Sequence, residues 1–456
     1  MNKILSRRDF LKLAGIGTTS AFLVACGGTA TEEPQPATEE EKEEEAAPVP
    51  TKEKQIVTFT MYGHPGMVEE MVPLFNETHP DVEVQFERSE GQGYWEKLSA
   101  SIAGGTAWDC FRGDQTRAIG WGPKEVIADV KPFMDTDQTY PLDGYIPGIL
   151  DVYRIGGKVF GVPTWCLTMW LFYNKKMFDE AGLAYPTDET TWDEYVDMAT
   201  KLTKTDADGN ITQYGTNAWE WWTFPVAQKV WSNGGHFYYN DDMTGIAIND
   251  PKTAAALQDI SDLIHVHKTN ASPLNPPTSP VGLLSDNVAT EANGDYMPWD
   301  NKDVYTEKYD YLDAVQCPTG NGSRVNIYWP DAFLVNETSK VKEGAYQWCR
   351  WFGSDPASIA IQCKVVFPVT KEAYSDEAIT KTWLVAPRPP GMIASALDHS
   401  TKARLWYGEL HLPDLDGVYY GEISRLWNNE AKADEVCATM QSLMEEVMAQ
   451  PVDIEV

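Results

Sequence analysis

The longest apolar stretch of the chain lies just after the paired glycines Gly156-Gly157, which predict a tight turn. The mostly apolar run Val159–Leu167, broken at Pro163, is followed by a second apolar run, Met169–Tyr173. A continuous run of this kind is typical of a strand buried on both faces, as in a parallel sheet. The pattern therefore predicts a central strand that is buried on both faces.

Two helix starts follow this segment. The polar residues Asn174-Lys175-Lys176 end the apolar run and predict the first of them. Thr191 is followed three positions later by Glu194, which is the spacing of a capping box. In this motif each of the two side chains accepts a hydrogen bond from the backbone N–H of the other residue. We therefore expect a helix that begins sharply after Thr191.

Strands and helices alternate before the central segment. Alternating and helical spacings predict strands at 56–61, 82–86 and 107–111, and helices at 67–75 and 94–102, the first kinked or shortened by Pro73 and the second ended by Gly104-Gly105. This order is βαβαβ, which implies a parallel sheet with crossover helices.

The second half of the chain continues the alternation. We expect a helix capped by Asp250, a proline-rich loop at 271–280, an extended segment at 324–335, an amphipathic helix at 339–352 stopped by Gly353, and a terminal helix at 435–448. The segment Asp206–Asn210 alternates Asp with other residues, as calcium loops do, but Gly209 is misplaced for an EF-hand and no glutamate follows at the required distance. A polar hairpin turn is the preferred interpretation.

The central segment resembles the signature of the extracellular solute-binding proteins of ABC importers, the family that includes the maltose-binding protein. The matching residues, in order, are Gly157–Pro163, Leu171–Lys175, Ala181–Leu183 and Thr191–Glu194. Weaker likeness extends over about residues 55–450. The resemblance implies an α/β fold of two lobes, the periplasmic-binding-protein fold, joined by three crossing segments.

The same resemblance implies lobe boundaries. Lobe one is expected at 55–168 plus 333–375, and lobe two at 172–325 plus 380–450. The three crossings would then lie near 168–171, 325–333 and 370–380. Such a connection permits hinge closure with little twisting.

The N-terminus predicts export. The segment Ser6–Lys12 matches the twin-arginine signal, and the apolar segment Leu13–Ala25 is too short for a comfortable membrane span. Leu23–Cys26 resembles a lipobox, so residues 1–26 are expected to be a lipoprotein signal in which Cys26 is acylated; the alternative is a transmembrane anchor. Residues 27–54, rich in Pro, Ala and Glu, are expected to be a disordered acidic tether.

Composition narrows the function. The chain has 456 residues and a formal net charge of −32, which argues against nucleic acid or anionic lipid as a partner of the folded body. Scattered histidines and cysteines without CxxC or HExxH argue against a zinc site, and we expect no metal and no cofactor. The six cysteines after Cys26 have the number to pair in an extracytoplasmic protein, but export of a folded chain does not require it.

Catalytic motifs are lacking, whereas aromatic residues are plentiful. The sequence has no GxSxG and no P-loop, and its 68 acidic residues supply many accidental carboxylate pairs. Seventeen tryptophans and 21 tyrosines favour a carbohydrate ligand, because rings cover the apolar face of a sugar. Five tryptophans at regular helix or strand positions are expected to be structural: Trp95, Trp108, Trp192, Trp348 and Trp351.

Ligands of open α/β sheets lie beyond the carboxyl ends of the strands, and this rule, with the family's late stacking aromatic, selects the candidate site. The predicted ligand-binding residues are Tyr62, Glu90, Arg112, Asp114, Gln115, Trp165, Trp219, Trp221, Trp222, Trp299, Asp300, Trp329, Asp331 and Tyr419, with Tyr420 as the alternative to Tyr419.

These features together predict a monomeric, lipid-anchored, extracytoplasmic binding protein rather than an enzyme. Its ligand is expected to be a carbohydrate, most simply a neutral oligosaccharide, delivered to the transmembrane subunits of an ABC permease. Two alternatives stay open: a lipid-anchored enzyme acting on extracellular carbohydrate, and a binder of another small solute such as a peptide or polyamine.

Overall fold

The computed structural model describes residues 53–451 except 92, 141, 221, 242–243, 273–276, 278–279, 321–323, 402 and 406–410. The predicted export signal with Cys26, nearly all of the predicted tether, and Trp221 therefore lie outside the described residues. No helix within the described part of the chain has the length and apolar character of a membrane span.

The first three strands form the parallel unit that the sequence predicts. Strand β1 (Gln55–Met61) pairs in parallel with β2 (Val82–Arg88) and with β3 (Cys110–Gly113), and helices α1 (Pro65–Thr78) and α2 (Tyr94–Ala103) connect them. Helix α1 continues through Pro73, so this proline does not shorten it. The βαβαβ prediction is confirmed.

Strand β3 begins at Cys110, three residues later than expected, and the preceding Asp109 bonds to β1 through its side chain. The Asp109 carboxylate accepts hydrogen bonds from the backbone N–H and the hydroxyl of Thr58, at 2.8 and 2.7 Å. The strand ends at Gly113, so Arg112 lies next to the end of the ladder.

The central segment is one long strand, β6 (Val162–Asn174), and it pairs with β11 (Asn326–Val335). Burial on both faces is confirmed, since Leu167 is the one residue of β6 that is not buried. The comparison with a parallel sheet was wrong: β6 runs antiparallel to β11, β12 (Phe367–Pro368), β9 (Thr290–Gly294) and β10 (Leu312–Val315).

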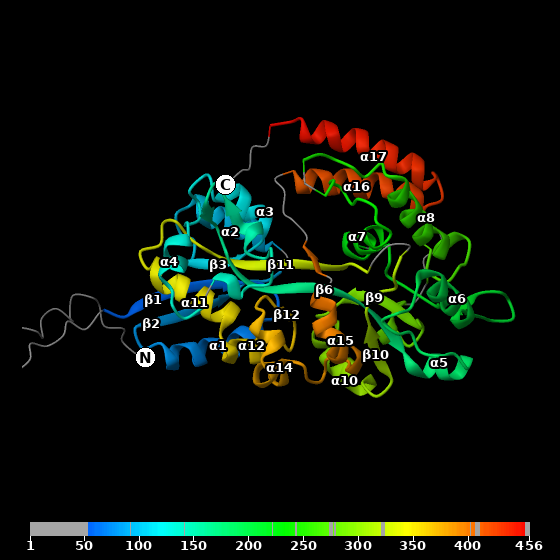
Figure 1. Ribbon diagram of the computed structural model, residues 1–456, viewed down its shortest axis with the longest axis horizontal. Coiled ribbons are helices and arrows are strands. Elements are labelled where there is room, and N and C mark those ends of the chain that lie inside the picture. The colour runs from blue at the N-terminus through cyan, green and yellow to red at the C-terminus, as the bar shows by residue number, and fades with distance from the viewer. Residues whose placement is uncertain are drawn as a thin grey trace, which may run out of the picture. The chain divides into compact units, whose positions relative to one another are not determined.

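Strands β6 and β11 connect two sets of elements, as Figure 1 shows. At one end, β11 pairs with β3, and the helices α1–α4 and α11 surround this end; we call it lobe one. At the other end β6 pairs with β9 and β10 beside α5–α8, α16 and α17; we call it lobe two.

The remaining helices are α3 (Gln115–Trp121), α4 (Lys131–Thr136), α5 (Lys175–Ala181), α6 (Trp192–Leu202), α7 (Thr223–Ser232), α8 (Pro251–His265), α9 (Met297–Asp300), α10 (Lys302–Lys308), α11 (Lys342–Ser354), α12 (Pro356–Gln362), α13 (Glu372–Ser375), α14 (Glu377–Trp383), α15 (Pro390–Thr401), α16 (Leu412–Trp427) and α17 (Ala433–Met448). Short strands complete the chain: β4 (Arg154–Ile155), β5 (Lys158–Val159), β7 (Lys204–Thr205), β8 (Ile211–Gln213) and β13 (Ala403–Leu405).

Both predicted helix starts are confirmed. Asn174 caps α5 by accepting from the backbone N–H groups of Lys176 and Met177, and Thr191 and Glu194 form the complete capping box of α6. The predicted stop at Gly353 is right to within one residue, since α11 ends at Ser354. Gly353 also has a packing role: a Cβ there would lie 2.3 Å from the carbonyl oxygen of Pro163 in β6, so this glycine permits close helix–strand packing.

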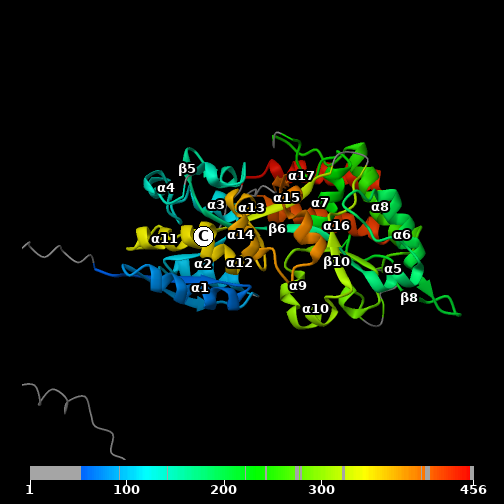
Figure 2. The same cartoon turned by 60° about the horizontal axis from the view of Figure 1, so that its bottom comes forward.

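The third passage between lobes differs from the expected 370–380. Helix α14 packs on α12, which belongs with lobe one, and α15 packs on β10 of lobe two (Figure 2). The chain therefore changes lobe between Trp383 and Pro390. The remaining lobe boundaries stay a prediction.

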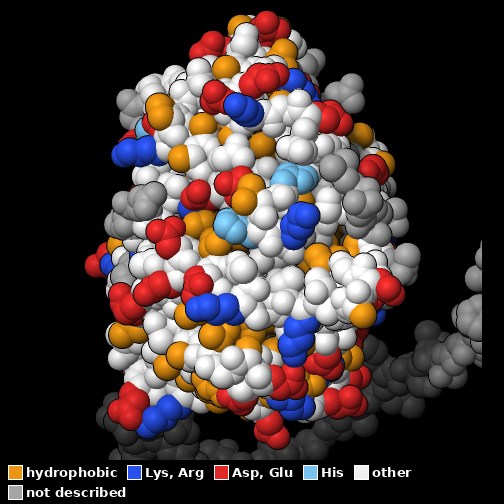
Figure 3. Space-filling view, turned by 90° about the vertical axis from the view of Figure 1, so that its right-hand side faces the viewer, with side chains coloured by type: hydrophobic (Ala, Val, Ile, Leu, Met, Phe, Trp, Pro, Cys, Tyr) orange, Lys and Arg blue, Asp and Glu red, His pale blue; other side chains and the backbone are white. Residues whose placement is uncertain are grey.

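Two further expectations concern the lobe-two surface and the cysteines. The turn Asp206–Asn210 joins β7 and β8, and the Asp206 carboxylate accepts from the backbone N–H groups of Asp208 and Asn210, as a polar hairpin turn requires. Acidic side chains are spread over the lobe-two face in Figure 3 and alternate with Lys and Arg.

The six described cysteines are all buried and unpaired, so the disulfide alternative is wrong for them.

Candidate ligand site

A cavity of about 200 Å³ lies where both lobes meet β6 and β11. It is lined by Tyr62, Trp95, Arg112 and Asp114 from lobe one, Leu167, Trp329 and Asp331 from the two crossing strands, and Trp222, Thr223, Phe224, Asp416 and Tyr420 from lobe two. These residues come from the ends of β1 and β3, the middle of β6 and β11, and the starts of α2, α7 and α16, so the fold brings together residues that are far apart in the sequence.

A buried ion pair forms the base of the lobe-one wall. Arg112 donates from Nε and Nη2 to Asp331 Oδ2, at 3.1 and 2.5 Å, and from Nη1 to the carbonyl of Tyr62, at 3.2 Å. The guanidinium also lies 4.2 Å from the centre of the Tyr62 ring. Burial alone would lower the pKa of Arg112, but Asp331 and Tyr62 more than offset this, so Arg112 stays charged.

A second arginine holds the neighbouring ring from behind. Arg117 lies 3.3 Å from the centre of the Trp95 ring and donates from Nη1 to Asp114, at 2.5 Å. Asp114 also caps α3 by accepting from the backbone N–H of Arg117. Trp95 and Asp114 are thus positioned by one side chain that itself does not line the cavity.

The facing wall is a stack of rings on lobe two. Phe224, in the first turn of α7, stacks on Trp222 with ring centres 4.0 Å apart, and it packs at a tilt of 36° against Trp329 of β11 with centres 4.6 Å apart. Trp222 and Trp329 are both half-buried. An aromatic surface of this kind suits the apolar face of a sugar ring.

Helix α16 adds two polar groups one turn apart. Asp416 and Tyr420 are four residues apart, so they share one face of the helix. Asp416 Oδ1 accepts from the hydroxyl of Tyr238, at 2.6 Å. Burial raises the pKa of Asp416, which the Tyr238 hydrogen bond partly opposes.

The cavity includes seven of the predicted site residues: Tyr62, Arg112, Asp114, Trp222, Trp329, Asp331 and Tyr420. Four others are buried in the protein and do not line it: Gln115, Trp165, Trp219 and Tyr419. Glu90 is an exposed surface residue, Trp299 packs against the core elsewhere, and Asp300 pairs with His64 at 3.1 Å.

The buried four are packed inside the protein, and two of them donate side-chain hydrogen bonds there. Gln115 donates to the carbonyl of Pro330, at 2.6 Å, and the Trp219 indole N–H donates to Tyr195, at 2.9 Å. Trp165 lies beneath Arg112, with the guanidinium 5.2 Å from its ring centre. Tyr419 packs between the rings of Phe237 and Tyr238, so the alternative, Tyr420, is the tyrosine of α16 at the cavity.

Sequence reasoning missed five lining residues: Trp95, Leu167, Thr223, Phe224 and Asp416. The structural interpretation of Trp95 is the clearest correction. Tyr94 and Leu98 form the buried face of α2, and Trp95 is rotated by about 100° from Tyr94 around the helix, which turns it toward the cavity. The sequence signal for this orientation was that Trp95 directly follows a buried residue of the same helix and so cannot lie on the same helix face.

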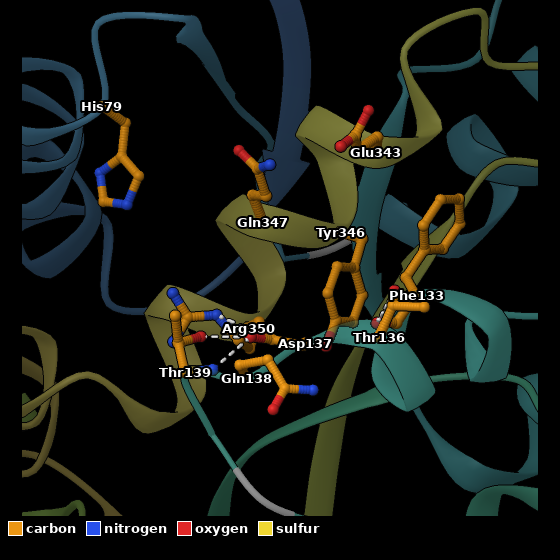
Figure 4. A pocket seen from close by; sticks show the side chains of 10 residues that line it. All are labelled: His79, Phe133, Thr136, Asp137, Gln138, Thr139, Glu343, Tyr346, Gln347 and Arg350. Carbon is orange, nitrogen blue, oxygen red and sulfur yellow. Dashed lines mark hydrogen bonds and ion pairs between the residues drawn. The ribbon is translucent and has the colours of Figure 1, made fainter.

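A larger cavity on lobe one, of about 480 Å³, is less suited to a ligand. Figure 4 shows Asp137, Thr139 and Arg350 gathered on one side of this cavity, with His79, Gln347 and Glu343 apart from them. Asp137 accepts from the hydroxyl of Tyr346 at 3.0 Å, from Arg350 at 3.2 Å, and from the backbone N–H of Thr139 at 2.8 Å. The carboxylate of Asp137 is therefore already satisfied within the protein.

Comparisons with known proteins identify the family and the fold. A model of the bacterial extracellular solute-binding protein family matches residues 64–359. The chain is 27% identical over 220 residues to an arabinooligosaccharide-binding protein of Bacillus subtilis, covering 47% of this chain and 48% of that protein. It is 24% identical over 164 residues to a mannitol-binding protein of Pseudomonas aeruginosa, covering 35% and 37%.

The chain thus spans between about a third and a half of the length of these curated relatives. The fold match is longer. An ABC substrate-binding protein of Listeria monocytogenes, solved in complex with cycloalternan, superposes with a TM-score of 0.74 at 21% identity, covering 87% of this chain and 99% of that one. This likeness shows the two-lobe fold.

Proposed function

Because the chain belongs to the family of bacterial extracellular solute-binding proteins, we propose that it is the carbohydrate-binding component of an ABC importer. The observation that carries the proposal is the cavity between the lobes, in which rings of both lobes face each other across carboxylates and an arginine. Rings cover the C–H face of a sugar, while charged oxygen and nitrogen atoms take its hydroxyls.

The ligand class is supported by the relatives. Proteins named for binding an arabino-oligosaccharide and a sugar alcohol match parts of this chain, and the fold neighbour was solved with an oligosaccharide. Polyhydroxylated, uncharged ligands are common to all three. A carbohydrate therefore fits both the cavity and these relatives better than a peptide or a polyamine.

Capture is proposed to occur by hinge closure. Residues of both crossing strands line the cavity, so bending of β6 and β11 changes the distance between the walls. The ligand must contact both walls to favour the closed form, because only differential binding shifts such an equilibrium. X-ray scattering should show a smaller radius of gyration with a saturating sugar, and identical profiles would argue against closure.

The direct test is calorimetry of the purified protein with arabino-, malto- and xylo-oligosaccharides and with sugar alcohols, followed by chromatography of the recovered ligand. Binding with the ligand recovered intact supports a transport protein. Conversion of the ligand into shorter products would instead support the enzyme alternative. Binding of none of these compounds would contradict the proposal.

The export signal and anchor remain part of the proposal. We infer acylation at Cys26, placement outside the cytoplasmic membrane, and delivery to the transmembrane subunits of a permease by a monomer. Metabolic labelling with a fatty acid tests this: the wild-type chain should be labelled and sediment with membranes. The Cys26→Ala variant should be unlabelled, and its labelling would contradict this assignment.

A further inference from the structure

The three carboxylates of the cavity differ in how their charges are balanced. Asp331 is paired with Arg112, and Asp114 is paired with Arg117. Asp416 has a single polar partner among the described residues, the neutral hydroxyl of Tyr238, and no described Lys, Arg or His forms an ion pair with it. The lobe-two wall therefore carries one uncompensated negative charge.

The arginine at the cavity does not offset this charge. Arg112 is the one cation among the described lining residues, and it is 8% exposed. Three of its N–H groups are used by Asp331 and by the carbonyl of Tyr62, so its charge is directed into the lobe-one wall. A ligand that reaches Asp416 therefore approaches a carboxylate that forms no ion pair with any described Lys, Arg or His.

The charge of Asp416 interacts more strongly with a bound ligand once the ligand has displaced water from the cavity. Asp416 is half-buried, and the rings of Trp222 and Phe224 are part of the same wall. In such a poorly solvated site, like charges repel more than in water, whereas an ammonium group gains a charge-assisted hydrogen bond. A hydroxyl group lies between these extremes, because it donates one neutral hydrogen bond.

We propose that Asp416 is the residue by which this site discriminates ligands by charge, so that it binds neutral and amino sugars and rejects sugars that carry a carboxylate or phosphate. This inference rests on the proposed carbohydrate function and adds a specificity determinant to it. Trp222, Trp329 and Tyr62 supply stacking that is common to all sugars, whereas Asp416 separates them by charge.

The test uses matched sets of sugars that differ at one group. For glucose, galactose and mannose, affinity is measured by calorimetry at pH 7.5 for the neutral sugar, its 2-amino derivative and its uronate, first for the wild-type protein and then for Asp416→Asn. The readout is the affinity ratio within a set, which a general weakening of binding does not change. In the wild-type protein the uronate should bind at least tenfold more weakly than the neutral sugar.

In Asp416→Asn the affinities for the uronate and for the neutral sugar should differ by less than about threefold, and any preference for the amino sugar should disappear. Asp416→Glu, which keeps the charge, should retain the rejection and also serves if the Asn variant fails to fold. The matched control is Asp414→Asn, which removes an equal charge from an exposed position of the same helix and should leave the ratios as in wild type.

Two results would overturn the inference: uronates that bind the wild-type protein as tightly as neutral sugars, or a rejection that persists unchanged in Asp416→Asn. Failure of every neutral, amino and acidic sugar to bind, together with failure of the oligosaccharides, would instead overturn the proposed carbohydrate function and this inference with it.

Discussion

Trp219 and Trp222 are separated by two residues, yet they belong to different environments. Trp219 is 1% exposed, and its indole N–H donates to Tyr195 inside lobe two. Trp222 is half-buried, stacks on Phe224 and lines the cavity. The same contrast separates Trp165 from Trp329 on the two crossing strands.

The difference teaches what distinguishes a structural group from a binding group in this protein. Trp219 and Trp165 are almost fully enclosed by protein, whereas Trp222 and Trp329 keep part of their surface at the cavity. Substitution of the first kind should lower the free energy of unfolding. Substitution of the second kind should lower ligand affinity.

The largest expected effect belongs to the core ring. Trp219→Ala should lower the free energy of unfolding by about 3–5 kcal/mol, because a large side chain is removed from a packed interior and Tyr195 loses a donor. Chemical denaturation measures this change. Trp222→Ala is the matched control, and a loss of equal size there would remove the distinction between the two tryptophans.

The buried ion pair between Arg112 and Asp331 lines the cavity and also stabilises the fold. Asp331→Ala should destabilise the protein by about 3 kcal/mol, because Arg112 would remain buried without its counter-charge. The double variant Arg112→Leu/Asp331→Leu should recover part of this stability but not ligand binding. Denaturation of both variants checks the pair, and a stable Asp331→Ala protein would contradict it.

The cavity rings should act on affinity. Trp222→Ala and Trp329→Ala are each expected to weaken sugar binding by about 1–3 kcal/mol through loss of the stacking surface. Calorimetry measures the affinity, and denaturation confirms that each variant remains folded. If both variants and Trp95→Ala bind sugar as tightly as wild type, the cavity described here is not the ligand site.

The buried carboxyl group of Asp295 should make the stability of the protein depend on pH. Burial raises the pKa of Asp295 to about 7, although Arg388 opposes the shift, and Asp295 Oδ1 accepts from the backbone N–H of Thr168 in β6 at 3.0 Å. Between about pH 4 and pH 7 the folded protein keeps this proton while the unfolded chain loses it. The contribution of Asp295 to stability therefore falls as pH rises, by about 1.4 kcal/mol per pH unit.

The measurement is denaturation at pH 5, 6 and 7 for wild type and Asp295→Asn. The difference in unfolding free energy between the two proteins isolates this one group, and it should move in favour of the Asn variant as pH rises. Parallel pH profiles of the two proteins would show that Asp295 titrates normally.

The smallest effect is expected at the capping box of α6. Thr191→Ala should cost about 1 kcal/mol, because the N–H of Glu194 loses its acceptor and the Glu194 carboxylate keeps only the backbone donor. Thr200→Ala, an exposed threonine of the same helix, is the matched control and should change stability by less than about 0.5 kcal/mol. Thermal unfolding compares the two variants.

Local patterns were sufficient for much of the fold. The parallel βαβαβ unit, the caps at Asn174 and Thr191, the buried crossing strand and the polar turn at Asp206 all depend on interactions within a few residues or on the period of apolar positions. Such signals are written into consecutive residues. The resemblance of the central segment then supplied the two-lobe arrangement.

The direction of pairing and the function of Gly353 needed the tertiary structure. A fully apolar run shows that both faces of β6 are covered, but it does not distinguish a parallel neighbour from the antiparallel β11. Likewise, the sequence shows Gly353 only as a helix end, whereas its missing Cβ is also required by the carbonyl of Pro163, which is 190 positions away. Contacts between distant segments leave no periodic signal.

The candidate site divides in the same way. The rule that ligands lie beyond strand ends was enough to select Tyr62, Arg112 and Asp114, since the strand ends themselves are predictable. It could not show that Trp95 lies on a different helix face from Tyr94. Nor could it show that Asp416, in the helix α16 near the end of the chain, lines the same cavity as Tyr62. The sequence determines which residues carry aromatic and charged groups, whereas only the packing of the two lobes on β6 and β11 decides which of them are left open to a ligand.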